Sequence, residues 1–423
     1  MIRPYSRLYI DMDGFFASCE QYFNPEYRYR PLVVAPWNND QSRVVTLSQE
    51  AKLVGITTGM RISEAKSIYP SLVVVSDSPS KYIKVHHQLK EILEQTFCRV
   101  QMLSIDEAVL TMPKYLDHRE DSLEVANLIR KQLTHKYNGV ITGSIGIASN
   151  TWLAKMASEL AKPDGLVCLE PDRSDYFDDF RLNQLNGISY GTVRRLAGLG
   201  VVSVKDFREM SLALLKQTFG INGVKWYLRW QGVEVPPMVS RQNKTMSHQS
   251  VIPPGLVKSD QDIGRYLTQM SWKLTRRMRD QGLKASEIWL RVKWYTPSKN
   301  HLSLSGKIQL VEPVNDIVRF NQSLRYILKE ILEDKSNLMM RGARVAKVSI
   351  GVSRLGQAEQ QILGLGSMSG ILRKSSGSEK LDKVIDRINQ AYGKGTIIPA
   401  SSLTKGQYTV SPDRIAFGHS VLD

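Results

Sequence analysis

The chain has 423 residues, more than a single hydrophobic core usually organises, so we expect several domains. It has three cysteines, none in a CxxC pair, which argues against a disulfide scaffold and a structural zinc site. It has no apolar run of the ~18 residues that a membrane helix needs, which argues against a membrane span. The N-terminus leads directly into a strand, which leaves no room for a signal peptide, and we expect a reducing, cytoplasmic location. An adjacent histidine pair, His86 and His87, is expected at the surface.

The formal net charge of +16 is unevenly distributed. Basic and acidic residues number 19 and 18 over residues 1–167, and 9 and 8 over 168–239. They number 21 and 9 over 240–355, and 8 and 6 in the remainder. Twelve of the sixteen excess charges therefore fall in one segment, which indicates a nearly neutral body joined to a module that binds a polyanion. A generally basic surface without this role is the alternative.

The first predicted strand ends in acidic residues. An apolar stretch from Leu8 to Ile10 leads to Asp11 and Asp13, which a period of 2 places on one face, and Gly14 follows. A helix predicted after this glycine begins with two aromatic rings. Solvated strand-end acids are the simpler explanation for such a pair taken alone.

Phe15 and Phe16, the two rings of this helix, would lie beside the acidic strand end. Aromatic pairs are more often core residues than ligand contacts, but a ring beside a nucleotide could stack on its sugar or exclude it. We expect Phe15 to be the more buried ring and to support Phe16.

A small unit follows, with short strands over 32–35 and 44–47 and a helix that Ser48 caps. It carries Thr46 and Lys52, which we interpret as candidates for contacting phosphate.

A second acidic stretch lies at Asp106 and Glu107, between apolar residues that are typical of strand ends. Adjacent side chains of an extended chain point to opposite faces, so these two can share a site only where a turn re-aims one of them, and Ser104 favours such a turn. If this strand neighbours the first, then Asp11 joins the pair in an all-oxygen cluster that suits Mg²⁺. Two Mg²⁺ ions roughly 4 Å apart would balance the charge and hold the attacking and leaving oxygens of a phosphoryl transfer.

Helices over 80–97 and 122–137 flank the second acidic stretch, and a strand over 140–147 leads to a helix that ends at Lys162. Alternating strands and helices predict a sheet with helices packed on it and the acids along one edge. Lys162 is a compact cation on a flexible stem, suited to reaching a triphosphate.

Residues from about 170 to 235 are predicted to form a helical module with short loops. Turns at Gly187 and Gly191 and at 220–223 precede helices, and such turns expose backbone N–H groups that bind phosphate without reading bases. The same pattern also ends ordinary helical hairpins.

Beyond a proline-containing linker, a basic segment is predicted to form a βαββαβ unit with its four strands in one sheet. Arg291, Lys293 and Lys347 alternate with apolar residues, so one face packs on the helices and a basic face is left for the polyanion. The predicted elements are a strand over 246–252, a helix over 260–281, strands over 288–294 and 302–308, a helix over 315–333 and a strand over 345–352.

Four motifs carry a resemblance to a known family. They are 11–17 (DMDGFFA), 104–108 (SIDEA), 146–150 (GIASN) and 160–165 (LAKPDG), in the order and spacing seen in Y-family translesion DNA polymerases. The chain looks most similar to the bacterial polymerase IV and polymerase V branch. The resemblance implies an α+β multidomain fold, a right-hand polymerase. Its parts are a palm and fingers over 1–169 with the fingers at about 15–80, a helix-hairpin-helix thumb over 170–235, a linker over 236–243, a βαββαβ little finger over 244–355 and a C-terminal tail over 356–423.

The resemblance also implies site residues. Asp11, Asp106, Glu107 and the backbone carbonyl of Met12 would hold two Mg²⁺ ions, for which Mn²⁺ could substitute. Phe16 falls at the steric gate against a ribose 2′-hydroxyl, and Lys162 at a triphosphate contact.

This chain departs from the family in the fingers. It keeps Thr46, but Gln49 and Lys52 stand where many members carry a Tyr and an Arg on the triphosphate. A lysine keeps the charge and loses the bidentate fork, so triphosphate binding is expected to be weaker or differently posed.

The polar, glycine-rich tail contains QQILGL over 360–365, which looks like the peptide by which bacterial polymerases dock on the sliding clamp. Gln360, Leu363 and Leu365 are the expected contacts, since exposed apolar residues in a polar stretch call for a partner pocket. A chance apolar cluster is the alternative. A final amphipathic helix over 381–392 is expected to cover part of the body.

The resemblance predicts low-fidelity, template-directed transfer of dNTPs to a primer 3′-hydroxyl across damaged template, as in SOS mutagenesis. The implied partners are primer–template DNA, dNTP and the sliding clamp, with an accessory mutagenesis subunit left open and no membrane. The alternative is a catalytically weak, polymerase-like scaffold that binds DNA and clamp. Loss of the metal-binding acids would indicate the scaffold, and all three are present. A nucleotidyl cyclase would need no thumb, basic sheet or clamp peptide, and no P-loop pattern for an NTPase occurs.

Overall fold

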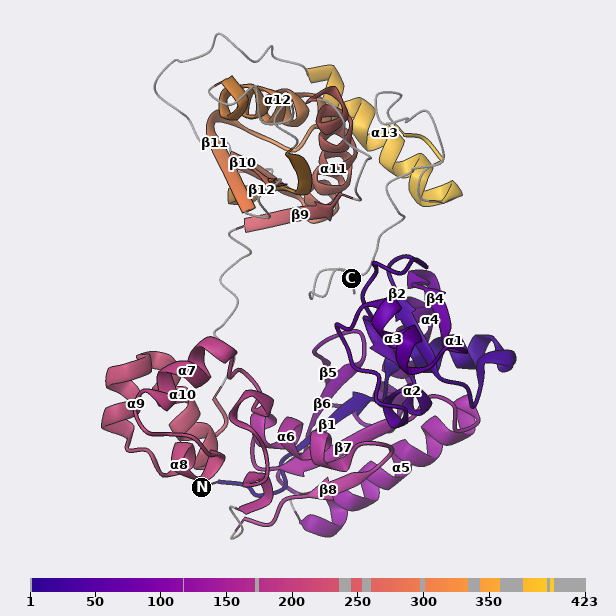
Figure 1. Ribbon diagram of the computed structural model, residues 1–423, viewed down its shortest axis with the longest axis vertical. Coiled ribbons are helices and arrows are strands. Elements are labelled where there is room, and N and C mark those ends of the chain that lie inside the picture. The colour runs from indigo at the N-terminus through magenta and orange to yellow at the C-terminus, as the bar shows by residue number, and fades with distance from the viewer. Residues whose placement is uncertain are drawn as a thin grey trace. The chain divides into compact units, whose positions relative to one another are not determined.

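The computed structural model shown in Figure 1 describes most of the chain in two compact units, around Met1–Pro236 and within Pro237–Pro412, each with its own core. No helix in the described residues is long and apolar enough to cross a membrane. The described residues are 2–116, 118–171, 175–235, 245–252, 260–296, 301–333, 343–357, 376–393 and 396–398.

The first unit is built on a five-stranded sheet in the order β5-β6-β1-β7-β8. Its central strand, β1 (Arg7–Met12), pairs antiparallel with β6 (Glu107–Thr111) and with β7 (Gly143–Ala148). The edge strands are β5 (Val100–Met102), antiparallel to β6, and β8 (Leu166–Cys168), parallel to β7. The two acidic strand ends are therefore neighbours, as the sequence predicts.

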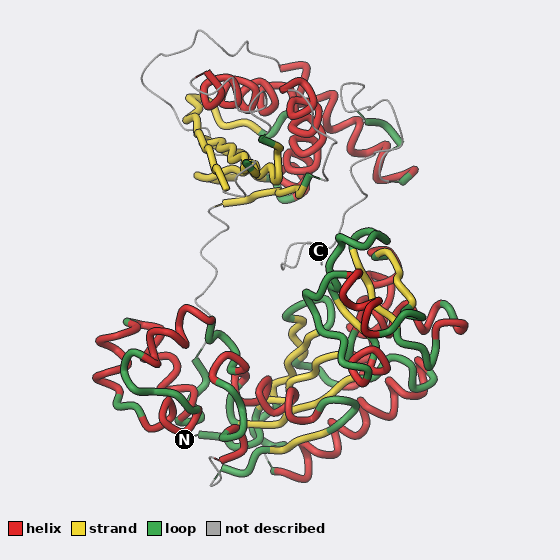
Figure 2. Tube along the Cα trace, in the orientation of Figure 1, coloured by secondary structure: helices red, strands yellow, loops and turns green. Residues whose placement is uncertain are grey.

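Helices cover both faces of this sheet (Figure 2). On one face, Leu8 and Ile10 pack in a core with α1 (Phe15–Phe23), α4 (Pro79–Thr96) and α5 (Arg119–Tyr137). On the other, Tyr9 packs with α6 (Thr151–Ala161). Because side chains alternate along a strand, Asp11 shares the face of Tyr9 and points to the α6 side.

A small three-stranded sheet in the order β3-β2-β4 forms beside α1 with its own core, in the region where the resemblance predicts the fingers. Ser48 caps its first helix and accepts a hydrogen bond from the backbone N–H of Ala51. The elements are a short 3-10 turn η1 (Pro25–Tyr27), β2 (Leu32–Ala35), β3 (Thr46–Leu47), α2 (Gln49–Leu53), α3 (Ile62–Ile68) and β4 (Val73–Ser76).

The residues after β8 form the predicted helical module, whose apolar residues share one core with α6. Trp152 of α6 joins the two parts, since its indole N–H donates to the carbonyl of Asn186 at 2.9 Å. The elements are the 3-10 turns η2 (Asp175–Phe177) and η3 (Leu182–Gln184), and the helices α7 (Tyr190–Ala197), α8 (Val204–Glu209), α9 (Leu212–Phe219) and α10 (Ile221–Trp230).

The second unit has the predicted βαββαβ order, with an antiparallel sheet in the order β11-β10-β12-β9 and two helices on one of its faces (Figure 2). β10, β11 and β12 run longer than predicted, whereas β9 has the predicted length. The linker over 236–243 lies outside the described residues. The elements are β9 (Thr245–Val251), α11 (Asp260–Asp280), β10 (Leu283–Tyr295), β11 (His301–Val314), α12 (Ile317–Glu333) and β12 (Arg344–Gln357).

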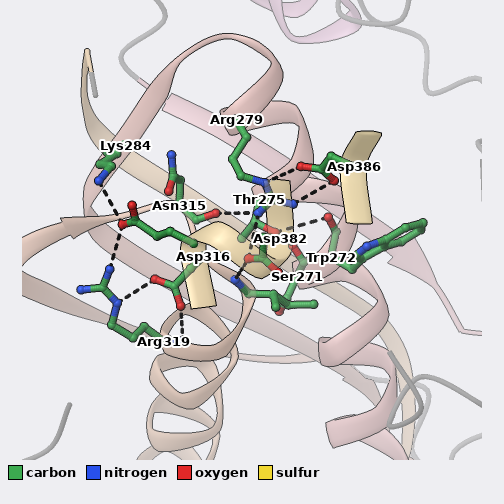
Figure 3. Close-up of polar contacts among 12 residues, drawn as sticks. Ser271, Trp272, Thr275, Arg279, Lys284, Asn315, Asp316, Arg319, Asp382 and Asp386 are labelled. Atoms are coloured by element: carbon green, nitrogen blue, oxygen red, sulfur yellow. Dashed lines mark hydrogen bonds and ion pairs between the residues drawn. The ribbon is translucent and has the colours of Figure 1, made fainter. Parts of the chain in front are cut away.

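One more helix, α13 (Ser376–Tyr392), packs against α12. Acidic side chains of α13 meet basic side chains of α11, β10 and α12 in a network of ion pairs and hydrogen bonds (Figure 3). The predicted C-terminal helix therefore covers part of the second unit.

Candidate active site

Two of the predicted acids face each other across β1 and β6. Asp11 lies directly opposite Glu107 in the antiparallel register, on the side of the sheet that α6 covers. Asp106 is held at the start of the same pair, because the backbone N–H of Met12 donates to its carbonyl at 3.0 Å. Its side chain accepts a 2.6 Å hydrogen bond from the hydroxyl of Ser104, in the turn that the sequence predicts. The sheet thus brings all three acids to one edge.

Asp13 follows the end of β1 and has a different environment. Its carboxylate accepts hydrogen bonds from the hydroxyls of Thr142 and Ser144 and from the backbone N–H of Asp164. These three donors tie it to β7 and to the loop after α6, so its role is structural.

The sheet edge that carries Asp11, Asp106 and Glu107 also holds two lysines. The ammonium of Lys162 lies 2.8 Å from Asp11 and 2.9 Å from Glu159, and Lys155 forms an ion pair with Glu107. Sequence reasoning singled out Lys162 but missed Lys155. A signal was present, since the two residues are seven apart and hence lie about two turns apart on one side of α6.

Burial and these lysines set the ionisation of the acids. Burial raises the pKa of Asp11 to about 7, and the charge of Lys162 offsets this only in part. Burial likewise raises the pKa of Asp106, against the hydrogen bond from Ser104. For Glu107 the effect of burial is outweighed by the hydrogen bond and charge of Lys155, which lower its pKa. Three carboxyl groups and two lysines thus share this edge, and a bound cation would favour the ionised forms of Asp11 and Asp106.

Among the described residues, no three acidic, histidine or cysteine side chains lie close enough together to hold a metal ion as they stand. The ion pairs give the reason, because Asp11 and Glu107 each contact a lysine instead of converging with Asp106. The chemistry of the donors still fits Mg²⁺, since three carboxylates and the carbonyl of Met12 are all oxygen ligands.

His86 is buried, with 2% of its surface exposed, so the expectation of a surface position is wrong. Its Nδ1 lies 2.8 Å from the carbonyl of Ile105, in the turn that carries Asp106. Burial lowers the pKa of this imidazole. His86 thus supports the acidic turn from α4, a contact between distant segments that local pattern does not reveal.

Phe15 and Phe16 are both buried, with 3% and 7% exposed, so Phe15 is the more buried ring as expected. The ring that stacks on Phe16, however, is Tyr82, with centroids 4.6 Å apart, whereas Phe15 is tilted at 5.7 Å. The Tyr82 hydroxyl donates to the buried carboxylate of Glu20 at 2.9 Å. Phe16 therefore contacts both Phe15, as expected, and Tyr82 of α4, which the sequence did not indicate.

Gln49 and Lys52 line a cavity of about 240 Å³. Gly14 and Leu47 also line it, and Leu47 directly follows Thr46 on β3. Pro163, the residue after Lys162, lines the same cavity. Of the candidate phosphate contacts, Gln49 and Lys52 thus line this cavity, while Thr46 and Lys162 are each next in sequence to a residue that lines it.

The glycine turn of the helical module forms as predicted. Gly187 has a φ of +87°, which an L-residue rarely adopts, and Ser189 caps α7 by accepting from the N–H of Thr192. Gly191 is the second residue of that helix. Gly187 and Ser189 line a cavity of about 860 Å³ that also borders Lys155. This turn therefore borders the same cavity as Lys155, the ion-pair partner of Glu107.

The basic face of the second unit is present. Ile288, Leu290 and Val292 are fully buried, while Arg291 between them is exposed. Lys293 pairs with Lys347 across β10 and β12, which puts these two cations side by side. Gln360, Leu363 and Leu365 lie outside the described residues.

Comparisons with known proteins match this architecture. The model of the impB/mucB/samB family matches residues 10–159, and that of the impB/mucB/samB family C-terminal domain matches residues 243–365. The chain is 33% identical over 331 residues to a DNA polymerase IV of Xanthomonas campestris pv. campestris, covering 76% of this chain and 91% of that protein. It is 27% identical over 417 residues to a DNA polymerase IV of Desulfatibacillum aliphaticivorans, covering 94% and 96%.

A solved structure described as "Y-family DNA polymerase chimera Dbh-Dpo4(243-245)-Dbh" is similar in fold, with a TM-score of 0.67 and 22% identity. The similarity covers 83% of this chain and 99% of that one.

Proposed function

The chain belongs to the impB/mucB/samB family and is a Y-family translesion DNA polymerase, and we propose that it transfers nucleotides at the edge formed by Asp11, Asp106 and Glu107. The pairing of β1 with β6 carries this proposal, because it sets Asp11 opposite Glu107 with Asp106 beside them. The substrates are a dNTP and the 3′-hydroxyl of a primer on template DNA.

We propose that the three carboxylates and the carbonyl of Met12 hold two Mg²⁺ ions, or Mn²⁺ in their place. When bound, such ions activate the attacking hydroxyl and stabilise charge on the transferred phosphate. Asp11 and Glu107 supply ligands once their ion pairs with Lys162 and Lys155 are broken. Lys162, 2.8 Å from Asp11, is then placed to bind the triphosphate. Thr46, Gln49 and Lys52 supply the fingers' contacts.

Selection of the sugar is proposed to rest on Phe16. A ring beside the incoming sugar packs against a 2′-deoxy carbon and collides with a 2′-hydroxyl, provided that it cannot move away. Tyr82 stacks on Phe16 from one side and is itself fixed through its hydrogen bond to Glu20. Phe15 fills the core beside it.

DNA binding is proposed to combine two kinds of contact. Gly187 and Gly191 present backbone N–H groups at the start of α7, while Arg291, Lys293 and Lys347 present cations on the open face of the second sheet. Both bind the phosphate backbone rather than base edges, so binding should be salt-sensitive and largely independent of sequence. Such binding suits low-fidelity synthesis across damaged template. The sliding clamp, which would bind residues 360–365, and an accessory mutagenesis subunit are further proposed partners.

A primer-extension assay tests the site. Asp106→Ala should lower the extension rate at least about 10³-fold, because it removes a group that acts on the reacting phosphate, and should leave primer–template binding intact. Asp40→Ala is the control, since Asp40 is an exposed acid that, within the described residues, forms an ion pair with Lys66 alone. Extension that survives in Asp106→Ala would contradict the site. Wild-type protein that binds primer–template without extending it would favour the scaffold.

A further inference from the structure

The cavity lined by Gln49 and Lys52 has a second wall that no site residue discussed above accounts for. Arg28 and Tyr29, from the loop between α1 and β2, line it together with Asn138 at the end of α5. Pro163, which directly follows Lys162, lies on the same wall. The cavity is therefore lined by, or adjacent in sequence to, residues to which the reaction proposed above assigns triphosphate contacts.

Tyr29 has an unusual backbone. Its φ is +59°, in the left-handed region that bulky L-residues avoid. The other residues of this kind in the described part of the chain are Asn138, Asp164 and Arg354, of which the first two are types that tolerate it. The ring of Tyr29 is 90% exposed, so packing does not offset the strain. A strained, exposed aromatic residue at a cavity is a reason to look for a ligand.

The groups around Tyr29 are hydrogen-bond donors suited to an oxyanion. Carbonyls of Gln21 and Tyr22 hold Nε and Nη2 of Arg28, which fixes the guanidinium. Within the described residues, neither the hydroxyl of Tyr29 nor the ammonium of Lys52 has a hydrogen-bond or ion-pair partner. These groups thus have capacity left for a ligand.

Two carboxylates share the cavity wall, so its charge is mixed. Asp13 already accepts from three donors, and Glu50 accepts from the side-chain amide of Gln21. With this charge balance, a neutral donor such as a phenol adds affinity for phosphate without needing a counter-charge.

We propose that the hydroxyl of Tyr29 donates a hydrogen bond to the terminal phosphate of the incoming nucleotide, with Arg28 and Lys52 beside it. Tyr29 is thus a binding residue of the reaction proposed above, and the inference depends on that reaction. The strained backbone is kept because it directs the ring to the cavity.

Two substitutions separate this role from a structural one. Tyr29→Phe keeps the ring and removes the hydroxyl, whereas Tyr29→Gly also relieves the left-handed strain. Both should raise the KM for dNTP about three- to tenfold, the loss expected for one hydrogen bond, with little change in kcat. Tyr29→Gly should at the same time raise the Tm of the protein. Tyr115→Phe is the control, because Tyr115 is 79% exposed and does not line this cavity.

Binding of a non-hydrolysable dNTP analogue to the enzyme–primer–template complex gives a second readout, in which the Kd should rise by the same factor. An unchanged KM and Kd in both Tyr29 variants would overturn the proposal. So would an effect of Tyr29→Gly that Tyr29→Phe lacks, because the hydroxyl would then not be the contact. Failure of the proposed reaction would look different, as wild-type protein that extends no primer.

Discussion

Replacing Arg279 with methionine should destabilise the second unit, because this arginine joins α13 to the rest of the domain (Figure 3). Its Nε donates to Asp386 at 2.6 Å and its Nη2 to the same carboxylate at 3.1 Å. Its Nη1 donates to the carbonyl of Asn315 at 2.8 Å and lies 3.3 Å from Asp382. One side chain therefore satisfies two carboxylates and a backbone carbonyl.

The expected loss follows from burial. The side chains of Arg279 and Asp382 are each 6% exposed and that of Asp386 is 15% exposed. Removing one partner of a buried ion pair leaves an uncompensated charge and costs about 3–5 kcal/mol in free energy of unfolding. Arg279→Met/Asp382→Asn should recover part of this loss, because one of the stranded charges is removed with it.

Hydrogen exchange of the α11, α12 and α13 amides in the full chain, read out by mass spectrometry, measures the effect on this unit. Arg265→Met is the matched control on the same helix, since Arg265 is 51% exposed, pairs only with Asp262 and should contribute at most about 1 kcal/mol. If Arg279→Met changed protection no more than Arg265→Met does, the reasoning about a buried, charge-dependent contact would be refuted.

Three further predictions concern function. Phe16→Ala should raise the ratio of kcat/KM for rNTP over dNTP by on the order of 10²-fold. Phe15→Ala should mainly lower the free energy of unfolding, by about 3–5 kcal/mol. A ratio that changes only in Phe15→Ala would mean that Phe15 is the gate. Lys347→Ala should weaken primer–template binding for all sequences and reduce the slope of log K against log salt by about 0.9, and an unchanged slope would exclude a phosphate contact. Deleting 360–365 should spare synthesis without the clamp and abolish stimulation by it, and persistent stimulation would place clamp binding elsewhere.

The placement of Asp11, Asp106 and Glu107 at one sheet edge was predictable where local pattern fixes the geometry. Alternation along β1 placed Asp11 at a strand end, and Ser104 next to Asp106 marked the turn that re-aims a carboxylate. The alternation of Arg291 and Lys293 with buried residues likewise predicted the basic face of the second sheet. In each case residues close in sequence also lie close together in the turn or strand concerned.

The supporting contacts were not predictable in this way, because they join distant segments. Tyr82 reaches Phe16 across 66 positions of sequence, and His86 reaches Ile105 from the same helix. Both lie on the α4 face that packs against α1 and the sheet, but periodicity alone shows only that a face is buried, not what it touches. The ion pairs of Asp11 with Lys162 and of Glu107 with Lys155 also join distant segments, and the seven-residue spacing of the lysines does not show which acids they contact.

The orientation of α13 shows how a partner surface can override the hydrophobic pattern of a helix. Asp382 and Asn389 are buried, with 5% and 1% exposed, while Leu381 and Val384 are 60% and 50% exposed. An amphipathic helix usually buries its apolar stripe. The surface opposite α13, however, presents hydrogen-bond donors. Besides Arg279, these are Lys284 and Arg319, which both bind Glu379, and the backbone N–H of Ile317, which donates to Asp382 at 2.9 Å. Leaving that N–H and those cations against apolar side chains would cost more than exposing a leucine and a valine, since buried unpaired donors lose their hydration. The acids of α13 therefore contribute to the choice of the face that turns inward, with Ile385 and Ile388 half-buried on the same helix.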